Sequence, residues 1–162
     1  MKVGDIMTRN VVSCRKDADI GTAARLMLEG RFGTLPVVDA HGTVAGIITD
    51  RDIAMAAATR QRNASHIGVH EAMSPKIRSC FADDEVGVAL KQMEAARVRR
   101  LPVLDATSHL TGILSVDDIV LRGLDETNGV SSAEFVKALR RICSQPALEP
   151  DVNFSSTLIT PS

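Results

Sequence analysis

The sequence predicts an α/β (α+β) chain built from two copies of a β-α-β-β-α unit, packed by pseudo-twofold symmetry and followed by a C-terminal helix and tail. Three observations carry this prediction. The chain repeats itself at a fixed offset, each copy has an apolar stripe with helical spacing, and each copy continues into two short apolar runs. The 162 residues are enough for two small units that share an interface.

An offset of 66 residues relates the two copies. Met7 matches Met73, since 73 − 7 = 66, and the same offset places the Leu-Pro-Val run at Leu35 on the one at Leu101. This register holds without a gap over residues 6–54, which chance does not produce. The chain is therefore divided into a first repeat (3–58), a linker (59–68), a second repeat (69–123) and a C-terminal extension (124–162).

Each copy begins with a short β-branched run and an acidic cluster, which suits a helix start because carboxylates accept hydrogen bonds from its free N–H groups. Apolar residues then follow at i, i+3, i+4, i+7 and i+8 from Ile20, the spacing of one helix face. Two apolar strands are expected next, at residues 35–38 and 44–48 in the first copy and at 101–104 and 110–114 in the second. A final helix is expected after Thr49 and after Ser115.

The repeat pattern stops after Gly123. A capping-box sequence begins at Ser131 and opens a predicted helix over about residues 132–143, with Phe135, Leu139 and Ile142 on one face. Residues 146–162 show little periodicity, and we expect a tail that is mobile or docked on a partner.

Composition excludes several classes of protein. A net charge of −1 excludes a generally basic nucleic-acid binder, and an aromatic content of 2% leaves almost no base-stacking platform. Neither a signal-peptide core nor an apolar run long enough to span a bilayer is present in the sequence. The three cysteines are far apart, and no pair has zinc-ligand spacing. We expect a cytoplasmic protein that binds neither nucleic acid nor membrane and holds no metal.

No catalytic residues are expected, because the sequence shows neither a nucleophile elbow nor a glycine-rich phosphate loop. What recurs is a Gly-x-x-Thr/Ser-x-x-Asp segment at each expected strand–helix junction. The two segments are Gly46–Thr49–Asp52 and Gly112–Ser115–Asp118. The pattern fits an ordinary helix cap, and it also fits a ribose site in which the hydroxyl caps while the Asp stays free for a cis-diol.

Both copies resemble CBS domains, the cystathionine β-synthase repeats that pair into Bateman modules. The resemblance rests on the Met-Thr/Ser pairs at 7–8 and 73–74, the Leu-Pro-Val-x-Asp runs and the two junction segments, and it covers residues 3–123. Paired CBS domains typically bind AMP, ADP, ATP or S-adenosylmethionine in clefts between the copies. The resemblance therefore implies a non-catalytic energy or metabolite sensor that requires no cofactor and has AMP as its leading ligand candidate.

The family's contacts, carried over, imply two clefts. The main cleft joins Ile47, Thr49 and Asp52 to Lys76, Ile77, Arg78, Val98, Arg99 and Arg100. The second cleft joins Ile113, Ser115 and Asp118 to Asn10, Val11, Val12, Phe32, Gly33 and Thr34. Guanidinium groups are forked donors that suit phosphate, so the arginine-rich main cleft is expected to be the better nucleotide site. Asp117 stands where the first copy has Arg51, which disfavours an anion in the second cleft.

A homodimer is also implied, since modules of this family commonly stack through their helices. The helices after Thr49 and Ser115, together with Phe135, Leu139 and Ile142, would supply the apolar interface. The signal would pass to a target protein that the sequence does not identify.

Two alternatives to this function stay open. One is an interaction or structural protein with empty clefts, and the other is a thiol- or metal-responsive protein that uses Cys14, Cys80 and Cys143.

Overall fold

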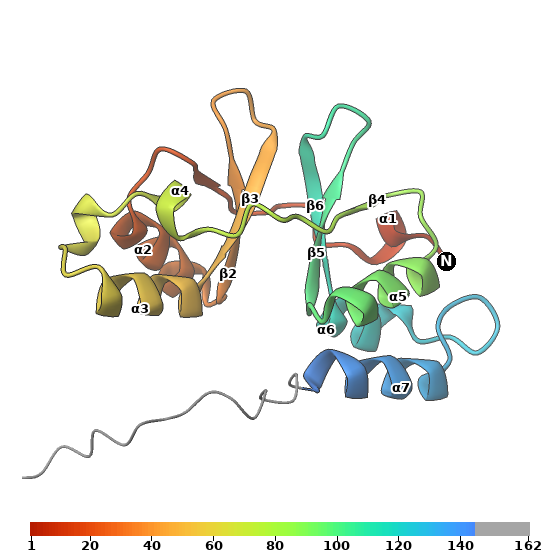
Figure 1. Cartoon of the computed structure of the whole chain (residues 1–162). Helices are drawn as coiled ribbons and strands as arrows, with labels where there is room; N and C mark the ends of the chain where they lie inside the picture. Colours follow the sequence, from red (N-terminus) through yellow and green to blue (C-terminus); the bar gives the residue numbers. More distant parts are fainter. Residues whose placement is uncertain (145–162) are drawn as a thin grey trace, which may run out of the picture.

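A computed structural model of the chain describes residues 1–144 and confirms the predicted α/β class. Two three-stranded sheets stand side by side (Figure 1). The first sheet contains β1 (Cys14–Arg15), β2 (Thr34–Val38) and β3 (Val44–Thr49). The second contains β4 (Cys80–Phe81), β5 (Arg100–Leu104) and β6 (Leu110–Ser115). In each sheet the middle strand is parallel to the first strand and antiparallel to the last.

The strands pair in the same register within each of the two sheets. Cys14 lies opposite Val37 in the first sheet, and Cys80 lies opposite Val103 in the second, both at the 66-residue offset. Each sheet also has a register irregularity at the same place, directly after Val37 and directly after Val103. The repeat in the sequence is therefore a repeat in backbone geometry.

The first long helix of each copy follows the predicted spacing. These helices are α2 (Ile20–Gly30) and α5 (Val86–Ala96). The Asp19 side chain caps α2 by accepting a hydrogen bond from the Thr22 backbone N–H at 2.9 Å. Both helices end at an arginine in the left-handed region, Arg31 with φ 54° and Arg97 with φ 53°. This turn stops each helix just before the next strand.

The last helix differs between the copies, although the sequence predicts a matching pair. The first copy has α3 (Asp50–Thr59), whereas the second has α6 (Val116–Asp118) followed by a π-helical turn, η2 (Ile119–Gly123). The alanines of α3 are strong helix formers, whereas η2 opens on two β-branched residues. At the end of η2, a Cβ on Gly123 would lie 3.0 Å from the Ile6 side chain, so the chain approaches closely there.

Each copy is completed by the segment that precedes the other. The first helix, α1 (Val3–Ile6), belongs to the core of the second copy, where the Val3 N–H donates to the Asp84 carbonyl at 2.9 Å. The segment with η1 (Ala64–His66) and α4 (Val69–Ala72) packs in turn on the first copy. The expected polar linker thus contains Ile67, which is fully buried in the first core.

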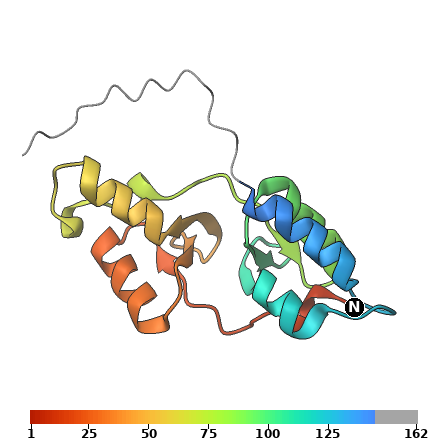
Figure 2. The same cartoon turned by 90° about the horizontal axis from the view of Figure 1, so that it is seen from below.

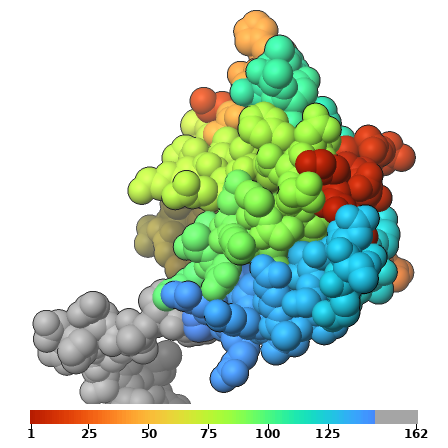
Figure 3. Space-filling model, turned by 90° about the vertical axis from the view of Figure 1, so that its right-hand side faces the viewer, coloured from red at the N-terminus to blue at the C-terminus, as the bar shows by residue number. Residues whose placement is uncertain are grey.

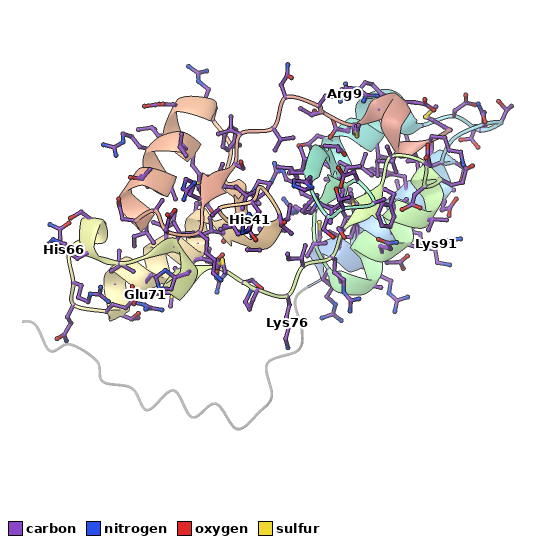
Figure 4. The ribbon with its side chains drawn as sticks, turned by 90° about the horizontal axis from the view of Figure 1, so that it is seen from above. Arg9, His41, His66, Glu71, Lys76 and Lys91 are labelled. Carbon is purple, nitrogen blue, oxygen red and sulfur yellow. The ribbon has the colours of Figure 1, made fainter. Side chains whose placement is uncertain are left out.

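The hairpins of the two sheets also touch. The Val44 N–H donates to the Ser108 carbonyl at 3.2 Å, and a ring nitrogen of His109 lies 3.0 Å from the His41 carbonyl oxygen. His41 lies on the side of the first copy that faces the second in Figure 4. Exchanged segments and touching hairpins together hold the two sheets beside each other.

The C-terminal helix, α7 (Ser132–Cys143), begins as the capping sequence predicts, with the Ser131 hydroxyl accepting from the Glu134 N–H at 3.2 Å. It lies along α5, on the outside of the second copy (Figures 2 and 3). Phe135 and Ile142 were expected to extend a dimer interface, but they are buried in the core of the second copy. This position corrects that expectation, because α7 covers the face of α5 from within the same chain. The expected tail at 146–162 lies outside the described residues.

Across residues 1–144, no helix is both long enough and apolar enough to cross a membrane.

Candidate functional site

Both strand–helix junctions form the cap that the sequence predicts. The Thr49 hydroxyl accepts from the Asp52 N–H at 3.2 Å, while Asp52 Oδ2 accepts from the Thr49 N–H at 2.8 Å and from its hydroxyl at 2.7 Å. Ser115 and Asp118 repeat this capping box with distances of 3.1, 2.8 and 2.6 Å. The expectation that the Asp stays entirely free is therefore wrong, because one oxygen of each carboxylate belongs to the cap.

The outer oxygens of the two carboxylates differ. Asp118 Oδ1 accepts from the Thr8 hydroxyl at 3.3 Å and is ion-paired with Arg122, and only 7% of Asp118 is exposed. Within residues 1–144, Asp52 Oδ1 accepts no hydrogen bond. The first junction thus keeps an acceptor available for a ligand, whereas the second uses both carboxylate oxygens internally.

A cavity of about 290 Å³ lies between the first junction and the second copy. It brings together five residues predicted for the main cleft, which are Ile47, Thr49, Val98, Arg99 and Arg100, and it adds Thr34 and Arg97. Asp52 joins this group through its hydrogen bonds to Thr49. Arg97 lies there because the left-handed turn that ends α5 places residues 97–100 at the start of β5.

Besides Asp52, three residues predicted for the main cleft do not line this cavity. Ile77 and Arg78 line a separate cavity of about 410 Å³ with Ser79 and residues near the end of α5. Lys76 is exposed on the segment that joins the copies and points away from both of them (Figure 4). This segment has no regular structure before β4, so nothing in the sheet register holds the three side chains toward the cleft.

The second predicted cleft is a smaller cavity of about 110 Å³. Six predicted residues line it, namely Asn10, Val11, Val12, Phe32, Thr34 and Ile113, and it adds Thr8, Pro36 and Arg100. Gly33, Ser115 and Asp118 are not in its lining: the Gly33 carbonyl accepts the Asp50 N–H at 3.0 Å, and the other two are buried in their own cap.

Arg100 lies between the two cavities and lines both, which corrects its assignment to the main cleft alone. Its Nη1 lies 3.5 Å from the hydroxyl of Thr34, the residue at the equivalent position of the first copy, since 100 − 34 = 66. Its Nη2 lies 4.0 Å from an Asp117 oxygen. Arg97 and Arg99 line only the main cavity, so the main cleft has the greater positive charge.

The cysteines divide into two buried thiols and one exposed thiol. Burial raises the pKa of Cys14 to about 11 and that of Cys80 to about 12. Thiols with such pKa values are almost entirely protonated at neutral pH and react slowly. Cys143, at the end of α7, accepts from Arg99 at 3.3 Å. The geometry of Cys14 and Cys80 therefore favours a packing role over a redox role.

The fold is a paired-repeat module. It contains two copies of one α/β unit, each completed by an exchanged segment, and cavities lie between the copies beside the first strand–helix junction and beside Thr8. The family model of the CBS domain matches residues 3–59 and 69–125. The chain belongs to the CBS domain family, as the sequence predicts.

Known relatives show both the pair and larger proteins that contain it. A homoserine O-acetyltransferase of Methanococcoides burtonii is 36% identical over 117 residues, which are 72% of this chain and 23% of that protein. The CBS domain pair of protein MJ0100, solved with 5′-methylthioadenosine and S-adenosyl-L-methionine, has a TM-score of 0.67 at 27% identity and covers 75% of this chain and 94% of its own. CBSX2 in complex with AMP has a TM-score of 0.65 at 25% identity, over 74% and 93% of the two chains. The chain thus spans less than a quarter of the matched acetyltransferase.

Proposed function

We propose that this chain is a regulatory module, without catalysis of its own, that binds an adenosine-type ligand in the main cleft. The observation that carries the proposal is a cavity lined by Thr49 and by the guanidinium-bearing Arg97, Arg99 and Arg100, with the available carboxylate oxygen of Asp52 beside Thr49. A carboxylate suits a ribose diol, and guanidinium groups suit phosphate. AMP contains both groups, and we propose it as the ligand.

Each part of the cleft has a role in this proposal. Asp52 Oδ1 accepts from the ribose hydroxyls while Oδ2 keeps the helix cap intact. Ile47 and Val98 provide apolar contact for the adenine ring. The arginines contact the phosphate. Adenosine compounds in the MJ0100 and CBSX2 structures support this class of ligand.

We propose that such a sensor passes its signal to a target protein. The matched acetyltransferase is several times longer than the matched region, which supports a regulatory role for the pair beside a separate activity. We propose a reducing, cytoplasmic setting, which two buried free thiols suit.

Thermal unfolding with ligands tests the proposal. A ligand that binds only the folded chain should add about 2.7 kcal/mol to the free energy of unfolding at a hundredfold excess over Kd. We expect AMP to raise the melting temperature, with ADP, ATP and S-adenosylmethionine as comparison ligands. If none of the four compounds shifts the melting temperature at millimolar concentration, the empty-cleft interaction protein becomes the better account.

We also propose a homodimer formed through the helices. On the helices after Thr49 and Ser115, which were expected to supply the interface, Ile119 is buried in the second core and Ile53 packs against the first. Leu28 on α2 and Leu121 on η2 remain 79% and 77% exposed, so both side chains are available to a second copy.

Light scattering tests the dimer. We expect twice the chain mass for the natural sequence and a shift toward the chain mass for Leu121→Asp, since a carboxylate does not fit an apolar interface. A single chain mass at every concentration, with and without AMP, would refute the dimer.

A further inference from the structure

The second junction has an internal partner that the first junction lacks. Arg122, on η2, is ion-paired with the outer oxygen of Asp118, and the Thr8 hydroxyl donates to the same oxygen at 3.3 Å. The equivalent positions in the first copy are Ala56 and Ser74, since 122 − 66 = 56 and 8 + 66 = 74. An alanine has no donor, so Asp52 keeps the acceptor that Asp118 has lost.

The position of Arg122 on the helix explains the contact. Asp118 and Arg122 are four residues apart, and residues at this spacing face each other along a helix. The Asp118 carboxylate is almost fully buried, whereas the Arg122 side chain is 48% exposed. The Arg122 guanidinium therefore shields the Asp118 carboxylate from solvent.

The second cleft has apolar walls of the kind that a nucleoside base requires. Val11, Val12 and Ile113 line its cavity and provide apolar walls. Ile113 is the equivalent of Ile47 in the main cleft, since 113 − 66 = 47. Besides its smaller volume and lower positive charge, the second cleft differs from the main cleft in lacking an available carboxylate oxygen beside it.

We infer that Arg122, by its ion pair with Asp118, blocks a second nucleoside site and so limits the chain to one adenosine-type ligand. Its guanidinium takes the carboxylate oxygen on which a ribose would depend. A charge-assisted hydrogen bond is stronger than a neutral one, so a ribose hydroxyl competes poorly for this oxygen. The inference rests on the proposed function and adds which residue sets the number of ligands.

Calorimetric titration with adenosine tests the inference. Adenosine has no phosphate, so the arginines of the main cleft do not decide its binding. We expect one adenosine per chain for the natural sequence and two for Arg122→Met, which removes the donors but keeps an apolar stem. The double variant Thr8→Ser, Arg122→Met gives the junction the hydroxyl residue of the first copy, and we expect two adenosines for it as well.

Two further variants act as controls. Arg140→Met removes an exposed arginine of α7 that lines neither cleft, and it should still bind one adenosine. Adding Asp118→Ala to Arg122→Met should return the number of adenosines to one, because the exposed carboxylate is then gone.

The outcomes separate this inference from the proposed function. Two adenosines on the natural chain, or one on both Arg122 variants, would overturn the role of Arg122 and leave the main cleft untouched. If no variant and no natural chain binds adenosine or AMP, the proposed function fails and the role of Arg122 fails with it.

Discussion

Asp52→Ala is expected to weaken the binding of AMP and of adenosine alike, by about ten- to hundredfold, because a lost hydrogen bond to a charged group costs roughly 1.5–3 kcal/mol. Arg100→Ala is expected to weaken AMP by a similar factor and to leave adenosine nearly unchanged, because adenosine has no phosphate. Titration calorimetry with the two ligands measures both effects. An equal loss for AMP and adenosine in Arg100→Ala would contradict a phosphate contact.

The equivalent carboxylate in the second copy provides the matched comparison, since 118 − 52 = 66. Asp118→Ala should leave the affinity for AMP nearly intact but lower the free energy of unfolding by roughly 1.5–3 kcal/mol, because it strips the cap of Ser115 and leaves Arg122 unpaired. Asp52→Asn keeps an acceptor for the Thr49 cap and should preserve stability while still weakening ribose binding. If Asp118→Ala abolished AMP binding and Asp52→Ala did not, the assignment of the two clefts would be reversed.

Phe135→Ala should lower the free energy of unfolding by about 3–5 kcal/mol, since truncating a buried aromatic residue leaves a cavity. Phe135 is 5% exposed and packs in the core of the second copy, although it lies outside the repeat. Denaturant unfolding measures the change directly.

The neighbouring Val136 is the control for this prediction, because it is 55% exposed on the same helix. Val136→Ala should change the free energy of unfolding by less than about 0.5 kcal/mol. Equal effects of the two substitutions would show that α7 does not belong to the core of the second copy.

The second and third strands of each copy follow closely from the sequence, whereas the first strands lie at Cys14–Arg15 and Cys80–Phe81, after the β-branched runs where they were expected. The predicted strand at 44–48 differs from β3 by a single residue, because alternating burial and a fixed repeat constrain the same positions twice. The N-cap at Thr49 was also predicted, since a hydroxyl residue before an acidic first turn is a local signal that needs no tertiary contact, but the hydrogen bonds from Thr49 to Asp52 Oδ2 were not.

Tertiary contacts account for what the sequence did not reveal. The partner of Asp118 is Thr8, 110 residues away, and α1 completes the core of the opposite copy. No local periodicity encodes such an exchange. Arg100 lies between the clefts because the pseudo-twofold arrangement brings it to Thr34, a contact that exists only once the two sheets meet. The π-helical turn after Asp118 ends at Gly123, which approaches Ile6 closely, and local periodicity does not encode this contact either.

A crystal structure of the chain with AMP tests the central claim most directly. The account predicts AMP in the cavity between the copies, with its ribose hydroxyls on Asp52 Oδ1 and its phosphate among Arg97, Arg99 and Arg100. AMP bound with its ribose on Asp118, or bound outside the cavity between the copies, would contradict it.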